Sequence, residues 1–263
     1  MKKHTLGLSI ATILLLAACG GGGSDDNNPA DPNNGGSNNN TPSVPKISSP
    51  AAPTNKVSGT YQGKAYIIPV NGGTGKAENI GGNNIATPTI SGQQIATEIP
   101  NISGGGMTFI SNSNIFGKSY RFFVASGRNE LPNSRFGYIN EGDKDYIFSH
   151  GTLTTNMPTS GTAKYSGEAV LGRSASGTLG TANITADFGQ KTLAGSITRS
   201  KDSDINFNQI DLNATISGNS FSGDGAVKAN GNFYGNNAAE VGGIFHDTTQ
   251  NLYGSFGAKR ASN

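Results

Sequence analysis

The chain has 263 residues, of which 39 are Gly, 11 are Pro and only 14% are charged, a composition that disfavours helix-dominated folds. The formal net charge is +2, but Lys2 and Lys3 lie at the N-terminus, and the other 17 basic residues match the 17 acidic ones. This balance argues against nucleic acid as a partner. A single cysteine excludes an intramolecular disulfide, an iron–sulfur centre and a cysteine-built zinc site.

Residues 1–18 are predicted to be a lipoprotein signal peptide. A lysine pair precedes an apolar run from Leu6 to Ala18, which is shorter than the roughly 20 residues of a membrane-spanning helix. The small residues before Cys19 resemble a lipobox, in which the cysteine is acylated and becomes the mature N-terminus. We therefore expect lipid attached to Cys19 to hold the protein on the membrane. The alternative is an ordinary signal peptide with an incidental cysteine.

Residues 19–56 are predicted to be the lipidated cysteine and a disordered linker. They are rich in Gly, Asn and Pro and have almost nothing to bury, so folding would not offset the entropy lost on ordering. A flexible chain of this length reaches roughly 35 Å, which lets the folded part stand off a membrane surface. Asp25 and Asp26 lie too far after the cysteine for inner-membrane retention, which favours the outer membrane.

Residues 57–155 are predicted to form a smaller, β-rich handle subdomain. Strands are expected at residues 59–68, 116–124, 135–139 and 146–148. The last two should pair across a turn, whereas residues 71–106 are rich in Gly, Asn and Thr and should be mostly loop. The large aromatic residues of this half would serve either the core or an exposed protein interface; they are Tyr61, Tyr66, Phe122, Phe123 and Tyr138.

Residues 156–263 are predicted to form an eight-stranded antiparallel up-and-down β-barrel, which makes the protein all-β. Side chains that alternate at period two, the pattern of half-buried strands, recur about eight times in this region. The expected strands and hairpins are residues 162–170, 182–198, 207–216, 221–227, 231–234, 240–245 and 252–258. Turns are expected at Gly189–Gln190 and Gly218–Asn219. Closing such a sheet removes its exposed edges.

Three segments carry a family resemblance: FSHGTLTTNMPTSGTAKYSGEAV (148–170), ANITADFGQKTLAGSI (182–197), and GNFYGNNAAEVGGIF followed by NLYGSFGAKR (231–260). They resemble the β-barrel domain of transferrin-binding protein B, whose family includes factor H-binding protein and the hemophilins. The resemblance implies a handle and barrel on the exterior face of a Gram-negative outer membrane, exported by the surface lipoprotein assembly modulator. Transferrin-binding protein B has two such lobes, whereas this chain has length for one.

The family motif near the C-terminus is expected to be structural. Phe233 and Tyr234 would fill the barrel, residues 237–240 would form one helical turn, and Glu240 would accept hydrogen bonds from backbone donors there. Two glycines would let the next strand bend. The motif residues are Phe233, Tyr234, Gly235, Asn237, Ala238, Glu240, Gly242, Gly243, Phe256 and Gly257.

The sequence gives little sign of catalysis. It has no GxSxG elbow, no phosphate-binding loop that opens a helix and no paired carboxylates on one element, so we do not expect an enzyme. His4 belongs to the leader, and the two remaining histidines lack partners at metal-ligand spacing, so no metal site is expected. His150 and His246 are nonetheless candidate ligands of haem iron, and haem is therefore the one cofactor that the sequence suggests.

These observations predict a surface lipoprotein that binds a host iron or haem carrier, whether transferrin, a haemoprotein or haem itself. An alternative is an adhesion or immune-evasion lipoprotein of the same fold that binds a host complement regulator. A third is a structural envelope lipoprotein with no external ligand. The balanced charge and the short chain favour a small ligand or a modest interface.

Overall fold

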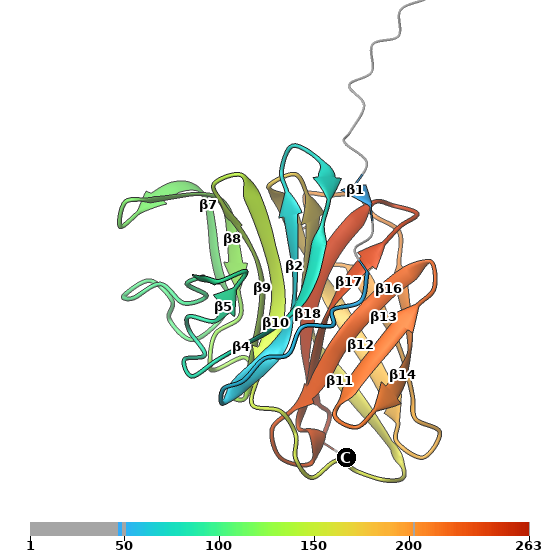
Figure 1. Ribbon diagram of the computed structural model, residues 1–263. Helices are drawn as coiled ribbons and strands as arrows, with labels where there is room; N and C mark the ends of the chain where they lie inside the picture. Colours follow the sequence, from blue (N-terminus) through green and yellow to red (C-terminus); the bar gives the residue numbers. More distant parts are fainter. Residues whose placement is uncertain (1–46, 49–50, 202, 263) are drawn as a thin grey trace, which may run out of the picture. The chain divides into compact units, whose positions relative to one another are not determined.

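The computed structural model describes residues 47–48, 51–201 and 203–262, which are almost entirely β-strands and turns (Figure 1). Cys19 and most of the predicted linker lie outside the described residues. The linker prediction is wrong at its C-terminal end, because Asn55 exchanges hydrogen bonds with Asn79 of the handle. The Asn55 side chain binds the backbone N–H and C=O of Asn79, at 2.7 Å each. The last residues of the predicted linker therefore belong to the folded part.

The handle is an eight-stranded antiparallel sheet. Its strands, in spatial order, are β6 (Gln93–Gln94), β5 (Thr89–Ile90), β4 (Lys76–Gly82), β2 (Tyr61–Pro69), β10 (Lys144–Gly151), β9 (Ser134–Glu141), β8 (Lys118–Ala125) and β7 (Thr108–Ile115). Beside this sheet, β1 (Ile47–Ser48) pairs in parallel with β3 (Gly73–Thr74). The handle is therefore as rich in strands as the barrel, although several of its strands are very short.

The handle confirms the predicted hairpin and corrects one strand. Ile139 lies opposite Tyr146, as the pairing of β9 with β10 requires. The strand expected over residues 116–124 begins only at Lys118, because Phe116 and Gly117 form a turn with φ angles of 50° and 80°. The preceding strand, β7, escaped prediction since most of its residues are exposed and show no alternation.

The second half of the chain closes into the predicted antiparallel up-and-down barrel (Figure 1). Its strands follow the chain: β11 (Thr162–Arg173), β12 (Ser176–Asp187), β13 (Thr192–Arg199), β14 (Ile210–Ser217), β15 (Ser220–Asp224), β16 (Val227–Tyr234), β17 (Glu240–Asp247) and β18 (Leu252–Arg260). The seam joins the first strand to the last, with Tyr165 opposite Arg260.

Strand boundaries within the barrel follow the sequence pattern with small differences. The β12–β13 hairpin pairs Ala186 with Leu193, and β14 turns into β15 at Gly218–Asn219, both as predicted. The strand expected to start at residue 207 starts at Ile210. Val227 begins β16 rather than ending the strand before it, because the chain turns at residues 225–226.

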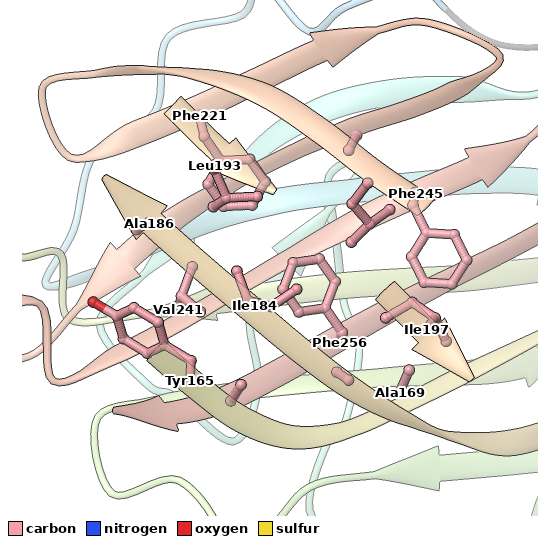
Figure 2. Packing of buried hydrophobic residues seen from close by; sticks show 14 of the residues in the cluster. Tyr165, Ala169, Ile184, Ala186, Leu193, Ile197, Phe221, Val241, Phe245 and Phe256 are labelled. Carbon is pink, nitrogen blue, oxygen red and sulfur yellow. The ribbon is translucent and has the colours of Figure 1, made fainter. Parts of the chain in front are cut away.

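Side chains fill the barrel interior (Figure 2). Figure 2 shows Tyr165, Ile184, Phe245 and Phe256 among the buried residues of this cluster. Phe221 lies against Gly231, where a Cβ atom would come within 2.3 Å of the aromatic ring. Glycines on the inward face thus make room for aromatic rings, which is how a small barrel fills its lumen.

A second cluster joins the outside of the barrel to one face of the handle sheet. It consists of Tyr66, Ile68, Phe122, Val124, Leu131, Phe136, Tyr138, Ile147, Val170, Ile244 and Tyr253. The opposite face of the sheet is covered by the chain around Ile90, Ile95 and Ile99. The handle and barrel therefore share one buried interface.

Candidate functional site

The motif residue Glu240 fastens the handle to the barrel. Glu240 is 1% exposed, and its carboxylate accepts hydrogen bonds from the Asn133 backbone N–H at 3.0 Å and side-chain Nδ2 at 2.7 Å. The Ser134 hydroxyl donates a third bond at 2.6 Å. The donors thus come from the handle rather than from the local turn that the sequence suggested.

Neighbouring motif residues divide between the lumen and the handle. Phe233 is buried inside the barrel, as predicted, but Tyr234 points the other way, since successive side chains of a strand alternate. The Tyr234 hydroxyl lies 3.2 Å from the Ser149 hydroxyl of the handle. The expected helical turn at residues 237–240 is a 3₁₀ turn over Asn236–Ala238, preceded by Gly235, and Glu240 already belongs to β17.

The motif glycines allow close packing. A Cβ atom on Gly242 would lie 2.6 Å from the Ser149 hydroxyl oxygen, and one on Gly257 would lie 2.4 Å from Leu131 of the handle. Gly243 instead lies under the ring of Phe221 within the barrel, and Phe256 belongs to the lumen cluster. These glycines lie within regular strands, so they allow close packing of neighbouring side chains rather than the predicted bend.

His150 lies buried in β10, at 1% exposure. Its Nε2 donates a hydrogen bond to the Ile85 carbonyl oxygen at 2.8 Å, and its Nδ1 is buried without a partner among the described residues. Burial lowers the pKa of the imidazole to about 4, and the charge of nearby Arg135 acts in the same direction. The ring is therefore neutral near pH 7.

His246 lies on the outer face of the barrel, 2% exposed and stacked on Tyr253 with ring centroids 4.2 Å apart. Both ring nitrogens lack a hydrogen-bond partner within the described chain, and burial lowers the imidazole pKa to about 4. Haem iron would reach either histidine only if the side chain left its buried place. The haem-ligand role of His150 and His246 stays a prediction.

The aromatic residues proposed for the core or for an interface lie mostly in the core. Tyr66, Phe122, Phe123 and Tyr138 are buried, and Tyr61 is half-buried. Tyr138 donates a hydrogen bond to the Asp145 carboxylate at 2.7 Å, and burial raises the pKa of that carboxyl. Four of the five are therefore closed to a partner in this fold.

Three other apolar residues of the handle are exposed instead. Ile102, Phe109 and Phe116 are exposed by 44%, 53% and 75%, and they are the large hydrophobic residues exposed in the described chain. The ring of Phe109 packs edge-on against Phe122, with centroids 5.6 Å apart. Phe116 forms the tip of the β7–β8 hairpin. Sequence reasoning missed Ile102 and Phe109 because isolated apolar residues in Gly- and Asn-rich segments carry no periodic signal, and it placed Phe116 in a strand rather than at a hairpin tip.

A cleft of about 520 Å³ lies on the same subdomain. It is lined by Asn84, Ala86, Thr87, Ala96, Glu98, Ile99, Pro100, Asn101, Ser103, Gly105, Gly127 and Arg128. Glu98 accepts a hydrogen bond at 2.7 Å from the buried Arg135 guanidinium, so the cleft wall is held by an ion pair. Clefts of this size accommodate small ligands or a protruding loop of a partner.

The handle thus offers exposed apolar side chains and a cleft, and both features suit non-covalent binding of a partner. Within the described residues, no three His, Cys, Asp or Glu side chains are grouped as a metal site would require. The same part of the chain holds no helix long and apolar enough to cross a membrane.

The barrel is similar in sequence to known proteins. Residues 157–260 match the family model described as the C-lobe and N-lobe β-barrels of transferrin-binding protein B. Transferrin-binding protein B of Moraxella catarrhalis is 31% identical over 193 residues, which cover 59% of this chain and 26% of that protein. An uncharacterized protein of Haemophilus influenzae is 35% identical over 145 residues, covering 49% of this chain and 48% of its own.

Solved structures show the same fold. Transferrin-binding protein B variants from Haemophilus parasuis superpose with a TM-score of 0.52 at 22% identity, over 76% of this chain and 45% of theirs. The protein from serogroup B Neisseria meningitidis gives a TM-score of 0.51 at 20% identity, over 76% of this chain and 43% of its own. The chain therefore spans less than half the length of these relatives.

Proposed function

Because the barrel of this chain belongs to the transferrin-binding protein B-like β-barrel family, we propose that the protein is a surface lipoprotein that binds a host iron carrier. That family consists of binding proteins rather than enzymes. The proposed location is the exterior face of a Gram-negative outer membrane, with lipid on Cys19 as the anchor and the surface lipoprotein assembly modulator as the exporter. The proposed role is acquisition of iron from the host.

The exposed apolar side chains of the handle carry the proposal. The barrel lumen is filled by its own side chains, so a partner must be met on the outside. Aromatic residues supply much of the binding energy at protein interfaces. Phe109 and Phe116 are the aromatic side chains of the described handle with the largest exposed fractions. A protein partner fits this surface better than a small solute.

Recovery from host plasma tests the proposal. The soluble protein, immobilised through an N-terminal tag in place of residues 1–46, should recover transferrin, or a haemoprotein that serves the same purpose. Recovery of a complement regulator without either carrier would overturn the proposal in favour of the immune-evasion alternative. Recovery of no plasma protein, together with protection of the chain from protease on intact cells, would support the structural envelope lipoprotein.

A pair of variants then locates the interface. Phe109→Ser combined with Phe116→Ser should weaken carrier binding at least roughly tenfold, since exposed aromatic anchors account for much of such an interface. Both side chains are more than half exposed, so thermal stability should change little. Thr185→Ser, at an exposed position of the barrel, is the matched control and should bind normally. Unchanged binding by the double variant would remove the handle surface as the site.

Haem binding is tested separately. Haem added to the purified protein should give a Soret shift if His150 or His246 binds the iron, and His150→Ala or His246→Ala should abolish it. A shift that survives both substitutions would remove these residues as ligands.

A further inference from the structure

Besides the cleft on the handle, a polar groove of about 400 Å³ lies between the start of the handle and the barrel. Neither Phe109 nor Phe116 lines it. One wall comes from residues 55–57, which lie in the blue segment that leads into β2 in Figure 1. Lys56 of this segment and Lys64 and Asn79 of the handle face Asn219, Ser220 and Asn232 of the barrel. Three separate parts of the chain therefore build the groove.

The groove is positively charged. No Asp or Glu lines it, and neither Lys56 nor Lys64 has a carboxylate within ion-pair distance among the described residues. Lys64 is half-buried, and its ammonium has the Asn79 side-chain oxygen as acceptor at 2.6 Å. Burial lowers the pKa of this lysine. A partly desolvated ammonium with spare N–H donors favours an anionic ligand.

The groove is also preorganised. Asn79 is held on both sides, since its backbone and side-chain amides all exchange hydrogen bonds with Asn55 at 2.5–2.7 Å. Its remaining acceptor, Oδ1, positions the ammonium of Lys64. The lysine therefore keeps its place without any ligand, which reduces the entropy lost on binding.

Asn232 supplies an independent sign of a ligand. Its side chain is 5% exposed, lines the groove and leaves Oδ1 buried without a hydrogen-bond partner in the described chain. Its Nδ2 makes one long bond of 3.4 Å to the Asn219 carbonyl oxygen. The unused Oδ1 would meet a donor such as a sugar hydroxyl group after a turn of the side-chain amide, which gives up only this one long hydrogen bond.

From this arrangement we propose that the groove binds an acidic sugar, whose carboxylate pairs with Lys64 and Lys56 and whose hydroxyl groups bond to Asn232 and its amide neighbours. Neutral sugars lack the carboxylate that the lysines require, and simple anions lack the hydroxyl donors that Asn232 requires. Two sources share this chemistry: the sialic acid ends of host glycans, and the octulosonic acid of the lipopolysaccharide core. The site is independent of the proposed carrier-binding surface.

Amide chemical-shift mapping by NMR tests this site. N-acetylneuraminic acid or 3-deoxy-octulosonic acid, added to the folded protein, should shift the amides of residues 55–64, 79, 219–220 and 232. The acid that binds more tightly identifies the source. N-acetylglucosamine and acetate, at equal concentration, should leave these amides in place. Equal shifts with either control, or shifts confined to other regions, would overturn the proposal.

Substitutions of Lys64 and Lys56 test how much each lysine contributes to binding of the acidic sugar. Lys64→Met should raise the dissociation constant of the acidic sugar roughly tenfold or more, and Lys56→Gln should raise it by about threefold because that side chain is exposed. Lys64→Met also removes the hydrogen bond to Asn79, so it can change folding stability as well as binding. Lys56→Gln breaks no hydrogen bond in the described chain, so its effect on binding is measured without a change in stability. Lys164→Gln, an exposed charge change outside the groove, should bind like the unaltered protein. Full affinity in both groove variants would contradict the assignment.

Discussion

At the scale of single residues, His150 shows how burial sets a charge state. The imidazole is neutral in the folded protein because its Nε2–H is used on a backbone carbonyl and its other nitrogen is cut off from water. The same residue in the unfolded chain would have the ordinary pKa of 6.5. A histidine with a lowered folded-state pKa binds fewer protons in the folded chain than in the unfolded one.

Folding stability should therefore depend on this residue in acid. The contribution of His150 is complete above pH 6.5 and is lost progressively as the pH falls from 6.5 towards about 4, where up to about 3 kcal/mol is missing. His150→Gln cannot titrate there, so urea unfolding should show a shallower loss of stability over this range. Lys164→Gln is the control and should follow the unaltered protein. Parallel curves for the His150 variant would contradict the argument.

At the scale of strands, the barrel depends on glycines that leave space in the interior for aromatic rings. Gly231→Ala should destabilise the protein by about 1–3 kcal/mol, because its Cβ would meet the Gly242 carbonyl oxygen at 2.2 Å and the Phe221 ring at 2.3 Å. Gly104→Ala is a matched control, since nothing lies within 4 Å of the added carbon. Denaturant unfolding of both variants measures the difference. An equal effect would mean that the barrel interior adapts to the extra atom.

Strands were predictable from the sequence where one face is buried. β12 alternates buried with less buried residues, and the turn between β14 and β15 carries Gly218, so the strand and the turn could both be located in advance. β7 could not, because its exposed polar residues look like loop. Glu240 was singled out, but its partners Asn133 and Ser134 lie more than one hundred residues away, a pairing that no local pattern encodes.

At the scale of the whole molecule, Glu240 couples the stability of handle and barrel. Glu240→Gln replaces a charged acceptor of three hydrogen bonds with a neutral amide and should cost about 1–3 kcal/mol. Hydrogen exchange should quicken at the Asn133 amide, which donates to this carboxylate. Glu130→Gln, at an exposed position, is the control and should change neither quantity. A Glu240 variant with unaltered exchange at Asn133 would show that the apolar interface alone holds the subdomains together.

The seam between β11 and β18 has a consequence for biogenesis. β18 pairs with β17 on one side and with β11 on the other, so the ring cannot close until residues 252–260 are available. Joining strands so distant in sequence is entropically costly, and such topologies fold slowly. A chain that is delivered N-terminus first therefore keeps this barrel open until β18 is available.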